Sequence, residues 1–112
     1  MKAQTMNHKE KMQYVKKILA EYHKATQMVK FEEAKYHFGN EEKKDKETYE
    51  LNRKIVEIDS VLNLLMNDDR LVIENEFITV HNDFWWVEYY SKSTYYRHLN
   101  RAVEEFICYY QI

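Results

Sequence analysis

Hydrophobic positions in the first third of the chain recur at alternating intervals of three and four residues. This spacing places them on one side of an α-helix and predicts one long helix over about residues 6–37. Gly39 and Asn40 stand where such a helix would end. The positions on the stripe are Met12, Val15, Leu19, Tyr22, Thr26, Val29 and Tyr36, and the stripe is widened by Ile18, Ala25 and Met28.

A second stripe with the same spacing follows the entirely polar segment 40–46, which we interpret as a loop. It predicts a helix over about residues 47–66. Because the connection is short, the two helices most simply form an antiparallel hairpin. The second stripe consists of Leu51, Ile55, Ile58, Leu62 and Leu65.

Three further helices are predicted in the rest of the chain. Residues 67–69 (Asn-Asp-Asp) have N-cap chemistry and introduce a helix over about 69–79. A loop then leads to a short helix over 84–90, and Ser91 caps a final helix over about 92–110. The expected fold is all-α, with a helical hairpin (1–66) for dimerisation or partner docking and a three-helix, helix-turn-helix module (67–112).

Two short segments, 77–80 and 85–90, are rich in aromatic and β-branched residues, so β-strands are the alternative there. Four large rings crowd the second segment, and they cannot all face one core. The expected arrangement turns Phe84, Val87 and Tyr90 inward, and Trp85, Trp86 or Tyr89 then covers the hairpin. An exposed aromatic patch that meets a partner is the alternative.

Composition narrows the function classes. The 112 residues include one glycine and no proline, which argues against sandwiches, Rossmann domains and P-loop enzymes. Cys108 is the single cysteine, and the five histidines show no ligand spacing, so we expect no metal site and no cofactor. Since no nucleophile–base pair is visible either, we expect a non-enzymatic protein. No apolar run reaches the ~20 residues of a membrane span, and we expect a cytoplasmic protein.

Charge is distributed unevenly along the chain. Residues 1–30 contain seven lysines and two acids, whereas residues 67–112 contain four basic and eight acidic residues, a net charge of −4. A basic first helix can meet an anionic partner such as nucleic acid. The alternative is a solvated helix face without a partner.

The final helix divides into two kinds of residue at helical spacing. Tyr95, Leu99, Ala102 and Phe106 form its apolar side. The other side starts with hydrogen-bond donors, as the recognition helix of a helix-turn-helix protein requires. These outward positions are Lys92, Ser93, Thr94, Tyr96, Arg97, Asn100 and Arg101.

Two tracts, Tyr-Ser-Lys-Ser-Thr-Tyr-Tyr-Arg (90–97) and Arg-Ala-Val-Glu-Glu-Phe (101–106), carry a family resemblance. Residues 60–110 resemble ArpU/RinA-type phage transcriptional regulators, which are relatives of sigma-70 region 4. A short family of uncharacterised mollicute proteins is also similar. Tyr89 departs from the pattern, because sigma-like modules usually have glycine there.

The resemblance implies a role for each matching residue. Ser91 matches the helix-initiating residue, and Lys92 and Ser93 match the first DNA-facing positions. Tyr96, Arg97 and Arg101 match outward positions that touch bases or phosphates. The full expected contact set is Ser91, Lys92, Ser93, Thr94, Tyr96, Arg97 and Arg101.

The first functional hypothesis is a DNA-binding transcriptional regulator that places the helix 92–110 in the major groove of double-stranded DNA. Few outward cations are present, so dimerisation through the N-terminal helices or help from lysines 9, 11, 16 and 17 is expected. The alternative is a protein-interaction module that binds RNA polymerase or another protein with little DNA contact, which the net charge of −4 favours.

Overall fold

The computed structural model describes residues 6–37, 46–79 and 83–111. Within these ranges the chain is all-helical and contains no strand, which confirms the predicted class and rules out strands at 77–79 and 85–90. The predicted turn at Gly39 and Asn40 lies outside the described residues. The elements are α1 (His8–His37), α2 (Lys46–Leu64), α3 (Asn67–Ile73), the π-helical turn η2 (Glu74–Ile78) and α4 (Lys92–Tyr110).

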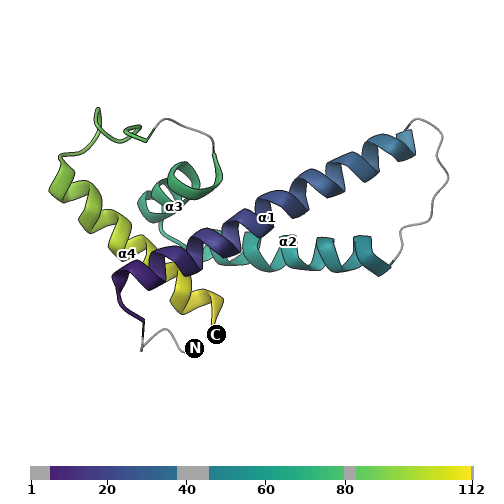
Figure 1. The fold of residues 1–112 in the computed structure, drawn as a ribbon, viewed down its shortest axis with the longest axis horizontal. Coiled ribbons are helices and arrows are strands. Elements are labelled where there is room, and N and C mark those ends of the chain that lie inside the picture. The colour runs from purple at the N-terminus through teal and green to yellow at the C-terminus, as the bar shows by residue number, and fades with distance from the viewer. Residues whose placement is uncertain (1–5, 38–45, 80–82, 112) are drawn as a thin grey trace.

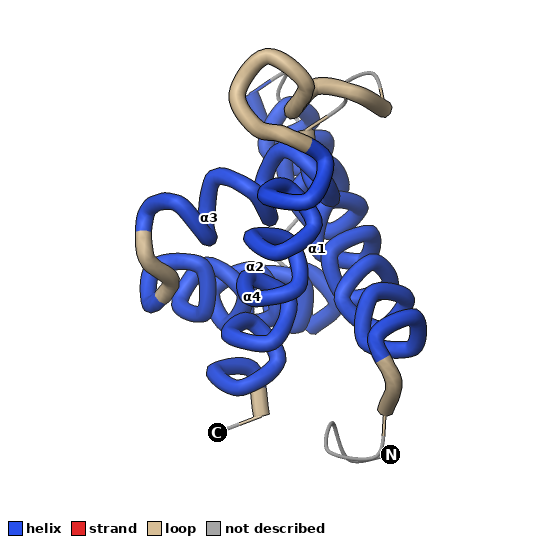
Figure 2. The backbone as a smooth tube through the Cα atoms, turned by 90° about the vertical axis from the view of Figure 1, so that its left-hand side faces the viewer, coloured by secondary structure: helices blue, strands red, loops and turns tan. Residues whose placement is uncertain are grey.

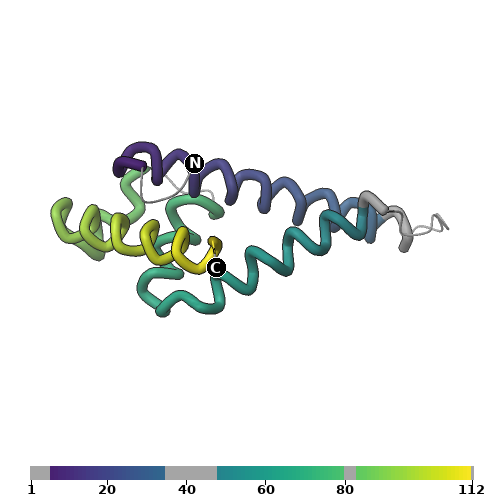
Figure 3. The backbone as a smooth tube through the Cα atoms, turned by 90° about the horizontal axis from the view of Figure 1, so that it is seen from below, coloured from purple at the N-terminus to yellow at the C-terminus, as the bar shows by residue number. Residues whose placement is uncertain are grey.

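The helices α1 and α2 run antiparallel (Figure 1). Helices α3 and α4 pack where α1 begins and α2 ends, so the other end of the pair projects away from them (Figure 3). The molecule is elongated, with principal extents of 52 × 34 × 21 Å.

The beginning of α1 follows from a local sequence signal. The Asn7 side chain accepts a hydrogen bond from the Glu10 backbone N–H at 2.9 Å, and the Glu10 carboxylate accepts one from the Asn7 N–H at 3.3 Å. This reciprocal pair is a capping box, which satisfies N–H groups that the first helical turn leaves without a partner. The helix therefore begins at His8, close to the predicted start.

One hydrophobic core joins all the helices. Val15 and Leu19 of α1 are fully buried, and they share the core with Ile58 of α2, Val72 of α3 and Phe106 of α4. Burial of each such side chain contributes about 1.5–3 kcal/mol. The core is continuous across residues 66 and 67, where the sequence suggests a domain boundary, so the short α3 and the end of the hairpin are buried together.

Polar contacts also fasten α1 to its neighbours. The Tyr22 hydroxyl donates to the Asp59 carboxylate of α2 at 2.6 Å. The Lys54 ammonium lies 3.0 Å from the Glu21 carboxylate, which lowers the pKa of Glu21 chiefly through that hydrogen bond. These contacts fix the register of α1 and α2 beside the core.

The Tyr22–Asp59 contact predicts a loss of stability in alkali. Burial, with the Asp59 hydrogen bond next, raises the pKa of Tyr22 to about 12 from an ordinary value of 10.0. The folded protein therefore holds this proton more tightly than the unfolded chain, and the contribution is intact below pH 10 and lost as the pH rises toward 12. Urea unfolding at about pH 9 and about pH 11 should show a smaller decline in Tyr22→Phe than in the wild type. An equal decline in both proteins would contradict this role.

The structure corrects the prediction of a short helix over 84–90. Residues 83–89 form successive hydrogen-bonded turns, in which the Val87 N–H donates to the Phe84 carbonyl and the Tyr90 N–H donates to the Trp86 carbonyl. Figure 2 shows this segment at the end of the molecule where α4 begins. We call residues 83–90 the turn segment.

The predicted orientation of side chains in the turn segment is wrong for two of the three residues expected inside, and Tyr90 alone packs partly buried against the core. Phe84 and Val87, expected inside, are 68% and 56% exposed, whereas Trp86 is buried. Trp86 stacks on Tyr95 of α4 and belongs to the common core. An irregular turn does not follow the helical period, so helical spacing assigns the wrong side chains to the core.

Candidate nucleic-acid interface

Ser91 is the N-cap of α4, as predicted. Its Oγ accepts a hydrogen bond from the Thr94 backbone N–H at 3.3 Å. The Ser91 hydroxyl also lies 2.9 Å from the Thr94 hydroxyl. Both predicted contact residues thus take part in fixing the first turn of the helix.

The two sides of α4 differ as the sequence predicts. Its apolar side is buried in the core through Tyr95, Leu99, Ala102, Val103, Phe106 and Ile107. Of the predicted contact residues, those that face solvent in the first two turns are Lys92, Ser93, Tyr96 and Arg97. The N-terminal half of α4 therefore presents two cations, a hydroxyl and a phenol together, and we call these four residues the donor face.

An aromatic stack holds the beginning of α4 in place. The Trp86 indole lies parallel to the Tyr95 ring, with centroids 4.6 Å apart and planes at 5°. The Trp85 ring meets the same tyrosine edge-on at 5.7 Å. The Tyr95 hydroxyl donates to the Glu76 carboxylate of η2, and burial, more than this carboxylate, raises the pKa of Tyr95. The stack and the hydrogen bond fix α4 against η2 and the turn segment.

Arg101 differs from the donor-face cations because it is bound to a carboxylate of the protein. Its Nε and Nη2 atoms both donate to Oδ1 of Asp69 in α3, at 3.0 and 2.8 Å. The Asp69 side chain is 3% exposed, and the Arg101 side chain is 52% exposed. The guanidinium compensates a buried carboxylate, so two of its N–H groups are used within the protein.

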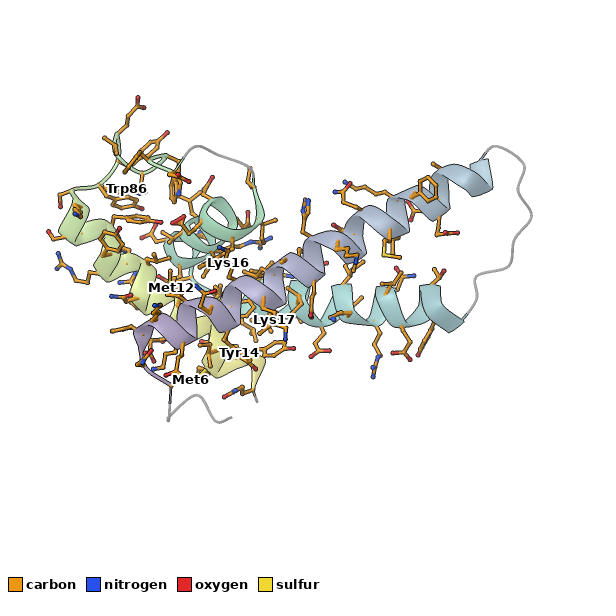
Figure 4. The ribbon with its side chains drawn as sticks, in the orientation of Figure 1. Met6, Met12, Tyr14, Lys16, Lys17 and Trp86 are labelled. Carbon is orange, nitrogen blue, oxygen red and sulfur yellow. The ribbon has the colours of Figure 1, made fainter. Side chains whose placement is uncertain are left out.

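The lysines that were predicted to assist DNA binding, at positions 9, 11, 16 and 17, all lie on α1. Lys11 forms an ion pair with Glu104 of α4. Lys16 and Lys17 are exposed, and Figure 4 shows them well separated from Trp86, which packs at the beginning of α4. Of the three cations in the expected contact set on α4, Arg101 forms an ion pair with a described residue, and Lys92 and Arg97 do not.

A surface hollow of about 880 Å³ lies between α3 and the turn segment. Leu71 of α3 and Asn75 of η2 line it on one side, and Phe84, Val87 and Tyr89 are among its lining residues from the turn segment. Leu71 is 49% exposed and Tyr89 is 71% exposed. Their accessible apolar surface makes the hollow a second candidate binding surface.

Sequence reasoning did not assign Leu71 and Val87 to this hollow, because both fit a buried helical stripe. One signal was available. The segment 84–90 contains more large apolar side chains than one face of a short helix can bury. Such an excess indicates that part of the segment faces solvent.

Among the described residues, histidine, cysteine, aspartate and glutamate side chains form no cluster of three or more that could hold a metal ion. No described helix is long and apolar enough to cross a membrane. Comparison with protein-family models, curated proteins and solved structures finds no match.

Proposed function

We propose that this chain is a DNA-binding transcriptional regulator that uses the start of α4 as its recognition element. The observation that carries the proposal is the donor face itself. Lys92, Ser93, Tyr96 and Arg97 are exposed on the first two turns of a helix whose opposite side is fixed in the core. A recognition helix needs this combination, because its N-terminal side chains reach base edges and phosphates.

The resemblance to ArpU/RinA-type regulators and sigma-70 region 4 supports the same reading. The matching tract spans residues 90–97 and includes the whole donor face. In this proposal Lys92 binds a phosphate, and Arg97 binds a phosphate or a guanine edge. In this proposal the N-terminal end of α4, which Ser91 caps, meets the DNA backbone, because helix N-termini favour anions.

The available charge sets the strength of binding. Two cations neutralise about two phosphates, so the logarithm of the affinity should fall with the logarithm of salt concentration with a slope of about −2 per protomer. Such binding is weak in a single copy. A dimer through the N-terminal helices would double the number of contacts and is part of the proposal.

The test is selection of a random duplex library at low salt, followed by gel shifts with the enriched sequence. We expect Arg97→Ala to lower the affinity about tenfold and Lys92→Ala to lower both affinity and salt slope. Lys24→Ala is the matched control, because Lys24 is exposed on α1. If no sequence is enriched, or if Arg97→Ala binds as well as the control, the proposal fails.

A second candidate function is binding to RNA polymerase or another protein with little DNA contact. The pairing of Arg101 with Asp69 favours it, because that pairing withdraws a cation from an already acidic region. A pull-down from lysate after nuclease treatment separates the two functions: recovery of polymerase subunits, with no enriched DNA sequence, supports the second.

A further inference from the structure

We propose that the hollow between α3 and the turn segment is a docking site for a short amphipathic helix of a partner protein, with Lys or Arg beside its apolar residues. This inference goes beyond DNA binding, because none of the four donor-face residues lines the hollow. The two surfaces share no residue and can be tested separately.

The apolar lining is accessible from both walls. Leu71 on α3 is 49% exposed, and Val87 and Tyr89 on the turn segment are 56% and 71% exposed. The volume of about 880 Å³ is within the range of sites that enclose a small ligand. Several apolar side chains of a partner can therefore enter the hollow and remove this surface from water.

The one charged residue among the described residues that line the hollow is acidic. Glu88 lines it and forms no ion pair with any described residue. Asp68 is exposed and precedes Leu71 by three residues, which places both on one face of α3. Arg70, on a different face of α3, is bound to Glu74 and Asn63.

This charge pattern selects the occupant. A partner segment with Lys or Arg beside its apolar residues gains attraction from the two carboxylates, and an acidic segment is repelled. A helix suits the site, because its backbone groups are already hydrogen-bonded when it enters an apolar hollow. The described residues contain no strand whose edge could pair with an extended peptide.

The experiment uses the whole chain and a phage-displayed library of random peptides about 16 residues long, enough for four helical turns. Selection on the wild type is followed by removal of peptides that also bind Leu71→Ser. We expect enriched peptides to have apolar residues at helical spacing and a net positive charge. Val87→Ser, which takes no part in the selection, should weaken the best peptide about tenfold.

Two further variants test position and charge. Val56→Ser is the matched control, because Val56 is a 62% exposed valine on α2. It should leave peptide affinity unchanged, whereas Glu88→Lys should weaken a basic peptide about threefold to tenfold and reduce its salt dependence. Circular dichroism verifies that each variant retains the wild-type helix content.

Several results would overturn the inference: no enrichment, enrichment of acidic peptides, or equal loss in Val56→Ser. Sedimentation tests a different occupant, since a dimer that dissociates in Val87→Ser would make a second copy of the chain the ligand. DNA binding by Leu71→Ser is measured in parallel. Failure of peptide docking with intact DNA binding rejects this inference alone, and the reverse result rejects the DNA proposal alone.

Discussion

Trp86→Ala is expected to lower the free energy of unfolding by about 3 kcal/mol and to release the turn segment from α4. Trp86 is 8% exposed, and its indole covers the Tyr95 ring over a parallel stack. Alanine would leave a cavity above the Tyr95 ring, and the short turn segment cannot rearrange enough to fill it. The loss includes buried area, the cavity and the ring–ring contact.

Chemical denaturation at neutral pH measures the effect. Tyr89→Ala is the control within the same segment, because Tyr89 is 71% exposed and should change stability by less than about 0.5 kcal/mol. Trp86→Ala should also weaken both DNA and peptide binding, since the stack orients the beginning of α4 and one wall of the hollow. Equal stability of the two variants would show that the stack does not hold the turn segment.

The long helices are predictable from the sequence because their apolar residues keep a helical period over many turns. Val15 and Leu19 on the first stripe and Ile58 and Leu62 on the second are buried, as expected. A period sustained this long has one structural solution. The division of α4 is predictable for the same reason, with Ser91 as an added local signal.

The turn segment is not predictable in this way. Its eight residues are too few to establish a period, and local spacing assigned Phe84 and Val87 to the core. The conformation of the turn segment depends on the stacking of Trp86 on Tyr95, a residue of the following helix. This is a tertiary contact, and in short elements tertiary contacts override the local secondary-structure propensity of the residues.

The role of Arg101 shows the same limit at the candidate site. By spacing, Arg101 is an outward cation of α4, and its exposed side chain agrees with that. Asp69 was expected at the start of a helix, as part of an N-cap signal, but α3 begins two residues earlier and carries the carboxylate into the core. Neither residue alone indicates the pair, because 32 positions separate them.

Arg101→Met is expected to lower the free energy of unfolding by about 2–3 kcal/mol, because it leaves the Asp69 carboxylate buried without its cation. The half-exposed guanidinium keeps the loss below that of a fully buried pair. The double variant Asp69→Leu/Arg101→Met should regain most of the stability, since apolar residues of similar size can replace such a pair. Denaturation of the two single variants and the double variant measures the coupling.

The ion pair between Lys11 and Glu104 is the control, because its carboxylate is exposed and that of Asp69 is buried. The Glu104 side chain is 49% exposed, so Lys11→Met leaves a solvated carboxylate and should cost less than about 1 kcal/mol. DNA binding by the double variant then separates two roles of Arg101. If affinity returns with stability, Arg101 acts by holding α3 against α4. If stability returns but affinity does not, Arg101 itself contacts DNA and belongs with Lys92 and Arg97.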